Sequence, residues 1–287
     1  MSLSQPLLKQ DSLLRLALEQ LADWTVGAET VSSISLLPHR GAHRVYRVGI
    51  TTEKGPRDVA IRMPSRSTHR GKITQLGQPF EREIANHVIA SQHQLAPQLF
   101  WTDPEHEIAV MEYATAGPAV NLEELADCLQ RIHGMTLQGN RLSLATTLDE
   151  YRRAASTGGD CEVTTLDPEL PSLQNAIAAL ADQPEAGCHH DLNSANLLRQ
   201  GHHLMAIDWE YAAPGDIYFD TAAASAGNPS IDGTALIRAV LGEKADLRVW
   251  QIARLVYRAV EINWLAAMGE TVAPREARML LNALEAV

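Results

Sequence analysis

Apolar residues recur every three to four positions in residues 7–24, and this period predicts a helix. The pattern then changes to alternation, which predicts strands at residues 31–37, 45–50 and 58–63, separated by turns at 38–41 and 53–56. A polar loop follows. Residues 80–93 then predict a helix that stops before Pro97, and short strands are expected at 99–101 and 108–111.

The chain changes character near residues 112–117, after which helical periods dominate. Helices are expected at 122–133, 148–155, 173–181, 234–241, 247–268 and 275–286. One β-hairpin interrupts them at residues 196–207, with its turn at 200–203. This order predicts an α+β fold with a small β-rich lobe over residues 1–115 and a larger, mainly helical lobe over residues 116–287.

The composition excludes several classes of protein. With 45% hydrophobic and 21% charged residues in 287, the chain can build an ordinary globular core. A net charge of −11 argues against nucleic acid as a partner, because nucleic-acid binding relies on basic surface. No apolar run approaches the roughly 18 residues of a membrane helix, and the first residues do not form a signal peptide. Three cysteines, far apart in sequence, favour reduced thiols in a cytoplasmic protein. The sequence does not indicate an oligomeric state.

The candidate chemistry lies in one polar stretch. Asp191 follows His189 and His190, Asn196 comes five residues after Asp191, and Asp208 comes 12 residues after Asn196, across the predicted hairpin. A short loop can direct Asp191 toward a substrate hydroxyl, and the hairpin can bring the oxygens of Asn196 and Asp208 to one metal ion. Such oxygens, together with phosphate, are the ligands that Mg²⁺ prefers. The order matches the H-x-D-x-x-x-x-N catalytic loop of protein kinases, followed by a metal-binding carboxylate.

Two further segments, IDWE at 207–210 and GDIYFD at 215–220, extend the match. With them the chain resembles the choline kinase and aminoglycoside phosphotransferase superfamily over about residues 30–285. It departs from the commonest pattern at His190, where glycine is usual. The resemblance implies a two-lobe, protein-kinase-like fold that uses ATP and Mg²⁺. Asp191 would be the catalytic base, and Asn196 and Asp208 would bind the metal.

The resemblance also implies a nucleotide site. Arg62, on the third predicted strand, would pair with Glu83 on the next helix and hold the phosphates of ATP. Arginine at this place looks like the choline and thiamine kinase branch, and it can bind phosphate with two donors. A surface ion pair of little energetic value is the alternative.

Two segments of the expected nucleotide site carry weaker signals. Gly41 lies where a phosphate-covering loop would be, but it is the single glycine of what alone would be a plain hairpin turn. A kinase hinge bonds adenine where the lobes join, although an ordinary linker between lobes is equally compatible with this sequence. The residues expected at the hinge are Met111, Glu112 and Tyr113.

The remaining candidates surround the loop. His189 and Asp220 are expected to orient it by hydrogen bonds, whereas Glu210 and Asp216 could contact the acceptor or the metal site. The aromatic residues are few, yet four of them cluster near these carboxylates: Trp209, Tyr211, Tyr218 and Phe219. Tyr257 and Trp264, seven residues apart on one predicted helix, share a face. Trp264 is the stronger candidate for an aromatic contact with a cationic acceptor, and a core role is the alternative.

These observations predict an ATP-dependent phosphotransferase that moves the γ-phosphate to a hydroxyl of a small cationic alcohol such as choline, ethanolamine or thiamine. An aminoglycoside or amino-sugar acceptor is the alternative, as is a non-catalytic nucleotide-binding regulator on the same fold. A protein kinase is disfavoured, because the sequence contains no D-F-G, A-P-E or G-x-G-x-x-G motif.

Overall fold

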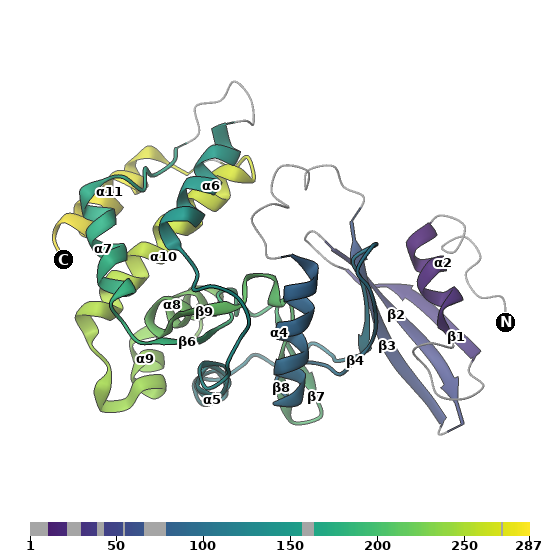
Figure 1. The fold of residues 1–287 in the computed structure, drawn as a ribbon. Coiled ribbons are helices and arrows are strands. Elements are labelled where there is room, and N and C mark those ends of the chain that lie inside the picture. The colour runs from purple at the N-terminus through teal and green to yellow at the C-terminus, as the bar shows by residue number, and fades with distance from the viewer. Residues whose placement is uncertain are drawn as a thin grey trace.

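The computed structural model describes residues 11–21, 30–38, 43–53, 55–65, 79–156, 164–270 and 272–287. The N-terminal part is built on an antiparallel sheet of five strands in the order β1-β2-β3-β5-β4. Helix α2 covers one face of this sheet and helix α4 lies on the other side (Figure 1). The elements are α2 (Ser12–Glu19), β1 (Thr30–Leu36), β2 (His43–Thr52), β3 (Gly55–Pro64), α4 (Phe80–Gln92), β4 (Leu99–Asp103) and β5 (Ile108–Glu112).

The alternation of β3 determines which side chains face each helix. Val59, Ile61 and Met63 are fully buried and pack in the cluster that contains residues of α2. Ala60 packs with Phe80 of α4 in a second cluster on the opposite face. Because successive side chains of a strand point to opposite faces, Arg62, two positions after Ala60, also faces α4.

The C-terminal part is mainly helical, and α10 packs against α6, α7, α8 and α11 (Figure 1). Its helices are α5 (Leu122–His133), α6 (Leu144–Ser156), α7 (Pro171–Ala181), α8 (Ile217–Gly227), α9 (Gly233–Leu241), α10 (Leu247–Ala267) and α11 (Pro274–Glu285). The strand pairs are β6 (Glu185–Cys188) with β9 (Ala213–Asp216), and β7 (Leu197–Gln200) with β8 (His203–Ala206). Two 3₁₀ turns, η2 (Trp209–Tyr211) and η3 (Gly242–Lys244), complete this part.

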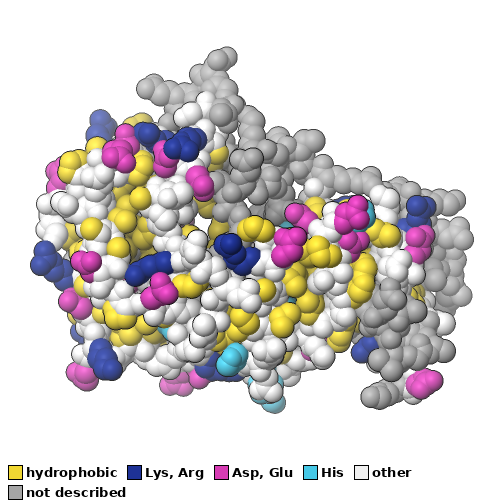
Figure 2. All heavy atoms as spheres, in the orientation of Figure 1, with side chains coloured by type: hydrophobic (Ala, Val, Ile, Leu, Met, Phe, Trp, Pro, Cys, Tyr) yellow, Lys and Arg dark blue, Asp and Glu magenta, His cyan; other side chains and the backbone are white. Residues whose placement is uncertain are grey.

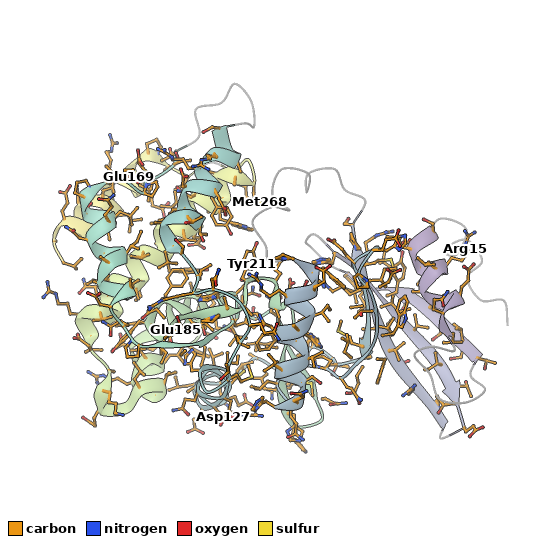
Figure 3. The ribbon with its side chains drawn as sticks, viewed as in Figure 1. Arg15, Asp127, Glu169, Glu185, Tyr211 and Met268 are labelled. Carbon is orange, nitrogen blue, oxygen red and sulfur yellow. The ribbon has the colours of Figure 1, made fainter. Side chains whose placement is uncertain are left out.

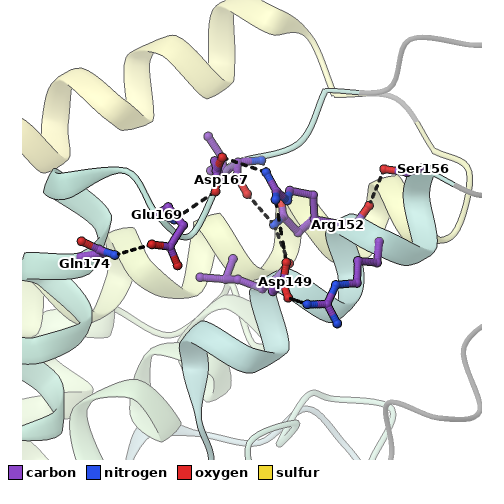
Figure 4. A network of polar contacts seen from close by, with 10 residues as sticks. Asp149, Arg152, Ser156, Asp167, Glu169 and Gln174 are labelled. Carbon is purple, nitrogen blue, oxygen red and sulfur yellow. Dashed lines mark hydrogen bonds and ion pairs between the residues drawn. The ribbon is translucent and has the colours of Figure 1, made fainter.

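Polar contacts position α6 against its neighbours. Arg152 of α6 pairs with Asp149 on its own helix and with Asp167 on the segment before α7, at 2.8 Å for the latter (Figure 4). Asn263 of α10 is fully buried, donates to the carbonyl oxygens of Leu148 and Leu166, and accepts from the Leu166 amide. The side-chain amide of Asn263 thereby joins α6, α10 and the segment before α7.

Backbone and side-chain hydrogen bonds connect the sheet to the helical part. Thr115, on the linker after β5, exchanges backbone hydrogen bonds with Arg199 of β7 at 3.0 and 2.8 Å. Asn86 of α4 is fully buried and donates to the carbonyl oxygen of Ala212, directly after η2, at 2.8 Å. The same side chain accepts from the Gln138 amide at 2.8 Å. Helix α4 is therefore bonded to two segments of the helical part, one directly after η2 and one between α5 and α6.

The predicted α+β fold is confirmed, with differences in detail. Helix α6 begins at Leu144 rather than at 148. Helix α8 and the short strands β6 and β9 were not expected from the sequence. Seven consecutive residues of α8, from Tyr218 to Ala224, are buried, so no polar face marks its period. The helix predicted at 7–24 is present as α2, Ser12–Glu19. Its ends at 7–10 and 22–24, and residues 39–41 of the predicted turn, lie outside the described residues.

Charged side chains of both signs are scattered over the face drawn in Figure 2, among apolar ones. In the described part of the chain, no helix is long and apolar enough to cross a membrane. Cys128 and Cys188 are buried free thiols, as expected for unpaired cysteines, and Cys161 lies outside the described residues.

Candidate active site

The loop between β6 and β7 presents the Asp191 carboxylate. One carboxylate oxygen accepts from Asn193 Nδ2 at 3.0 Å and the other from Asn196 Nδ2 at 2.8 Å. Asn196 Nδ2 also donates to the Asp191 carbonyl at 2.9 Å, so its amide hydrogens are directed to Asp191 and its Oδ1 remains for another partner. Burial raises the pKa of Asp191 to about 6, and the negative charge of Asp208 adds to that rise.

His189 is fully buried and holds the start of this loop by two hydrogen bonds. Its Nε2 donates to the Ile207 carbonyl at 3.1 Å, and its Nδ1 accepts from the Asp191 amide at 3.3 Å. Burial lowers the pKa of His189, which favours the neutral ring that these two bonds require. The ring also contacts Trp209, with the centroids 4.7 Å apart. These contacts fit the loop-orienting role predicted for His189.

A hydrogen bond between the His190 amide and Asp220 holds the backbone of the loop. His190 has a φ of 64°, a left-handed conformation that suits glycine better than histidine. Its amide donates to Asp220 Oδ1 at 2.6 Å, and Asp220 Oδ2 pairs with His133 Nε2 at 2.9 Å. Burial alone would raise the pKa of Asp220, but the hydrogen bonds from the His133 ring and from the His190 amide outweigh it and lower this pKa to about 2. Asp220 is thus an ionised anchor for the loop.

Arg62, on β3, is about nine-tenths buried. Its two terminal nitrogens contact the two carboxylate oxygens of Glu83 at 2.9 and 3.1 Å. The nitrogen that bonds Glu83 at 3.1 Å also donates to His43 Nε2 at 2.7 Å and lies 3.6 Å from Asp208 Oδ1. Burial works against the charge of Arg62, yet Glu83, Asp208 and Glu210 raise its pKa overall. The pairing predicted for Arg62 and Glu83 is present, and it is buried rather than a surface ion pair.

The oxygens of Asn196 and Asp208 fit a hard divalent cation. Asp208 Oδ1 is buried and accepts no hydrogen bond from any described residue, and such an atom needs a partner. Asp208 has a φ of 66°, a sparsely populated conformation for aspartate that is often found at functional sites. The amide of Ile207 donates to the Asn196 carbonyl at 2.9 Å, so the two segments run side by side. Carboxylate and amide oxygens of this kind suit Mg²⁺.

Three tyrosines, Tyr151, Tyr211 and Tyr257, interact electrostatically with the Asp191 carboxylate. Tyr151 of α6 interacts with Tyr211, and the charges of Glu210 and Asp191 act on both phenols. Tyr257 of α10 is influenced by Asp191 and Tyr151. Figure 3 shows Tyr211 between the helical part and α4. Aromatic faces beside carboxylates form an environment that favours an organic cation.

Three of the other aromatic candidates are core residues, and one of them, Phe219, contacts Tyr257 with the ring centroids 5.9 Å apart. Trp209 is fully buried and donates to the Ala206 carbonyl, and Tyr218 and Phe219 are also core residues. Trp264 lies two turns beyond Tyr257 on α10, about 10 Å along the axis, with 37% of its surface exposed. Of the aromatic residues singled out in the sequence, Tyr211 and Tyr257 interact electrostatically with Asp191. The acceptor contact expected of Trp264 stays a prediction.

The residues of the predicted hinge lie at the C-terminal end of β5 and directly after it. Met111 is buried in the cluster that contains Ala60, and the amide of Glu112 donates to the Gln98 carbonyl at 2.8 Å. Tyr113 lies under the guanidinium of Arg47, 4.7 Å from the ring centroid. The phosphate-covering role expected for Gly41 falls outside the described residues.

Asp216 is not brought together with Asp191. It is the N-cap of α8, and its Oδ1 accepts from the Phe219 amide at 2.7 Å. Its carboxylate lines a pocket to which Asp191 does not contribute. The acceptor contact expected of Asp216 stays a prediction.

Sequence reasoning missed three residues that shape the site: His43, Asn86 and Tyr151. Asn86 occupies the buried face of α4, where a polar residue interrupts the apolar pattern. Because buried polar groups need hydrogen-bond partners, this interruption could have predicted a structural role for Asn86. His43 and Tyr151 belong to no motif, and their contacts arise only when distant segments fold together.

Comparisons with known proteins agree with this geometry. Residues 34–256 match the phosphotransferase enzyme family. No curated protein sequence matches the chain. A choline/ethanolamine kinase family protein from Mesorhizobium loti is 18% identical, with a TM-score of 0.61, and the match covers 96% of this chain and 100% of that one. The choline kinase LicA from Streptococcus pneumoniae is 16% identical, with the same coverage of both chains and a TM-score of 0.67, and it also has a structure in complex with AMP.

A spectinomycin phosphotransferase in complex with ADP and spectinomycin is 11% identical, with a TM-score of 0.51, and the match covers 96% of this chain and 94% of that one. These similarities show that the chain has the fold of the small-molecule kinases. The chain belongs to the phosphotransferase enzyme family, and it is an ATP-dependent small-molecule phosphotransferase.

Proposed function

We propose that this protein transfers the γ-phosphate of ATP to a hydroxyl of a small organic cation, with Asp191 as the catalytic base. The observation that carries the proposal is the meeting of Asp191, Asn196 and Asp208 opposite the buried Arg62–Glu83 pair. Asp191 would accept the hydrogen bond of the acceptor hydroxyl and then its proton. A pKa of about 6 leaves this carboxylate ionised at neutral pH and more basic than an ordinary aspartate.

Asn196 Oδ1 and Asp208 would hold Mg²⁺, which supplies charge neutralisation for the phosphates when bound. Arg62 would direct its donors to phosphate oxygens, while Glu83 fixes the orientation of the guanidinium through two contacts. His189 and Asp220 would act only as positioning residues, because their hydrogen bonds go to the loop and not to the cleft.

The adenine would lie against the apolar cluster around Ala60 and Met111, with the backbone of Met111, Glu112 and Tyr113 as its hinge. We therefore propose lobes at residues 1–115 and 116–287, with ATP between them. The AMP complex of LicA and the ADP complex of the spectinomycin phosphotransferase support nucleotide use on this fold.

The proposed acceptor site consists of Tyr151, Tyr211 and Tyr257, with Glu210 providing negative charge. Burial raises the pKa of Tyr151 to about 12, so this phenol stays neutral and presents an aromatic face rather than a charge. A cationic alcohol such as choline, ethanolamine or thiamine fits these groups, since each cation–π contact contributes roughly 0.5–2 kcal/mol. We place Trp264 at the outer edge of this site, since 37% of its surface is exposed.

An ADP-release assay with choline, ethanolamine, thiamine and kanamycin as acceptors tests this proposal. We expect turnover with at least one of the first three and an increase in its KM of about tenfold in Tyr257→Ala, which corresponds to about 1.4 kcal/mol. Trp264→Ala, on the same helix, is the matched control and should change KM less. Turnover with kanamycin alone, or equal effects of the two variants, would contradict the acceptor assignment.

A further inference from the structure

A pocket of about 260 Å³ opens on the helical part of the molecule, outside the cleft that contains Asp191. Its walls come from the segment leading into α6, from the C-terminal end of α7 and from the junction of β9 and α8. Most of these walls are apolar, and they include Leu142, Ile177, Leu180 and Phe219. The volume lies just below the range of roughly 300–1,000 Å³ that is typical of ligand pockets, so a compact ligand would fit.

Asp216 contributes an unsatisfied acceptor to this pocket. Only 5% of the residue is exposed, and its Oδ2 is buried and receives no hydrogen bond from any described residue. The other oxygen caps α8 by accepting from the Phe219 amide, so the carboxylate is held in one orientation. A buried acceptor without a donor costs roughly 1–3 kcal/mol, more when it is charged. A ligand that donates a hydrogen bond here would remove that cost.

His190 contributes a second acceptor. Its Nδ1 lies 3.0 Å from the Tyr211 carbonyl, which can only accept, so Nδ1 carries the proton. Burial lowers the pKa of His190 and keeps the ring neutral, which leaves Nε2 as an acceptor. The ring fits because residue 215 is glycine: a Cβ at Gly215 would lie 2.3 Å from Nε2. The chain thus combines a histidine in the left-handed conformation with a glycine that makes room for the ring.

Arg141 also lines the pocket, but its position does not make the pocket an anion site. Its Nη2 donates to the carbonyl oxygens of Leu180 and Gln183 at 3.1 and 3.3 Å. The guanidinium is therefore bound to the C-terminal end of α7, where carbonyl groups carry partial negative charge. The positive charge of Arg141 also acts on Asp216, whose Oδ2 still accepts no hydrogen bond from any described residue.

We propose that this pocket is a second ligand site, which binds a small primary ammonium compound with a compact apolar body. The ammonium group donates to Asp216 Oδ2 and His190 Nε2, and the apolar body packs on the leucine, isoleucine and phenylalanine walls. A quaternary ammonium ion does not fit, because it has no N–H to donate. This requirement separates the pocket from the aromatic acceptor site, where a quaternary cation fits. The inference does not depend on which acceptor the enzyme phosphorylates.

Titration calorimetry of the full chain, without nucleotide or metal, tests the inference with cyclohexylammonium as the probe. At about pH 8 the probe is charged and Asp216, whose pKa burial raises to about 6, is ionised. Cyclohexanol has the same ring without the charge, and tetramethylammonium has the charge without a donor. We expect cyclohexylammonium to bind at least about tenfold more tightly than either, because charge-assisted hydrogen bonds are the stronger ones.

Three variants locate the binding. Asp216→Asn keeps an oxygen for the Phe219 amide but removes the charge, and Ala181→Phe fills the mouth of the pocket from an exposed position. Both should weaken cyclohexylammonium binding by at least about tenfold. Asp191→Asn, in the cleft, should leave it unchanged, which distinguishes this site from the acceptor site. No binding by the wild type, equal binding of the three probes, or loss in Asp191→Asn with retention in Ala181→Phe would overturn the inference.

Discussion

At the scale of single residues, burial and hydrogen bonds shift the pKa values of two aspartates in opposite directions. Asp220 receives hydrogen bonds from His133 and His190, so its pKa falls to about 2 and it stays charged as an anchor. Asp191 is buried among neutral amides beside another carboxylate, so its pKa rises to about 6. The anchor thus keeps its charge over the working range of pH, and the proposed base becomes a better proton acceptor.

The raised pKa of Asp191 predicts the acid limb of the pH–rate profile. Because the proposed base must be ionised, kcat/KM should fall as the pH drops through about 6, by about tenfold per pH unit below it. Initial rates at low acceptor concentration measure this limb. The residual activity of Asp191→Asn should lack it, and a wild-type profile that is flat between about pH 5 and 7 would contradict the assignment.

The geometry of Arg62 predicts that lysine cannot replace it. Lysine has a single ammonium group and cannot contact both oxygens of Glu83 and a phosphate with fixed donors. Arg62→Lys should raise the Kd for ATP by about tenfold or more, as measured by fluorescence titration. Arg153→Lys is the matched control, since Arg153 of α6 pairs with Asp149 at the surface and 75% of its side chain is exposed. Equal affinities of the two variants would argue against a phosphate contact.

At the scale of elements, α4 connects the sheet to the catalytic segments. Its Glu83 fixes Arg62 on β3, and one turn later its Asn86 bonds the backbone at Ala212 and Gln138. The loop after the helix adds a bond from the Ala206 amide to the Leu95 carbonyl at 2.7 Å. One helix therefore sets the spacing between the proposed phosphate contact and the proposed metal ligands.

Removing the Asn86 side chain should loosen this connection. Asn86→Ala leaves the Ala212 carbonyl and the Gln138 amide without their partner in a fully buried place. The free energy of unfolding should fall by about 1–3 kcal/mol, as measured by urea denaturation. Val88→Ala, on the same helix with 37% exposure, should change it by about 0.5 kcal/mol or less. Similar losses in both variants would show that the hydrogen bonds do not hold the elements together.

At the scale of the whole molecule, the order of elements and the family could be predicted from the sequence, because local period and motif spacing carry that information. Helix α5 begins and ends where predicted, since Asn121 and Glu124 form a capping box at its start. Helix α8 was missed because burial on all sides removes its polar face. Tyr151 of α6 interacts with Tyr211, which lies 60 positions later in the sequence. No local sequence pattern predicts a contact between residues so far apart.

The central claim is that Asp191 performs the chemistry while Asp208 serves nucleotide binding through the metal. Parallel measurements of turnover and of Mg²⁺-dependent ATP binding, on the wild type, Asp191→Ala and Asp208→Ala, test it most directly. We predict that Asp191→Ala loses at least about a hundredfold in turnover with nearly unchanged ATP affinity, the scale expected for a positioned base. Asp208→Ala should lose the Mg²⁺-dependent part of ATP binding. Wild-type turnover in Asp191→Ala would contradict the account.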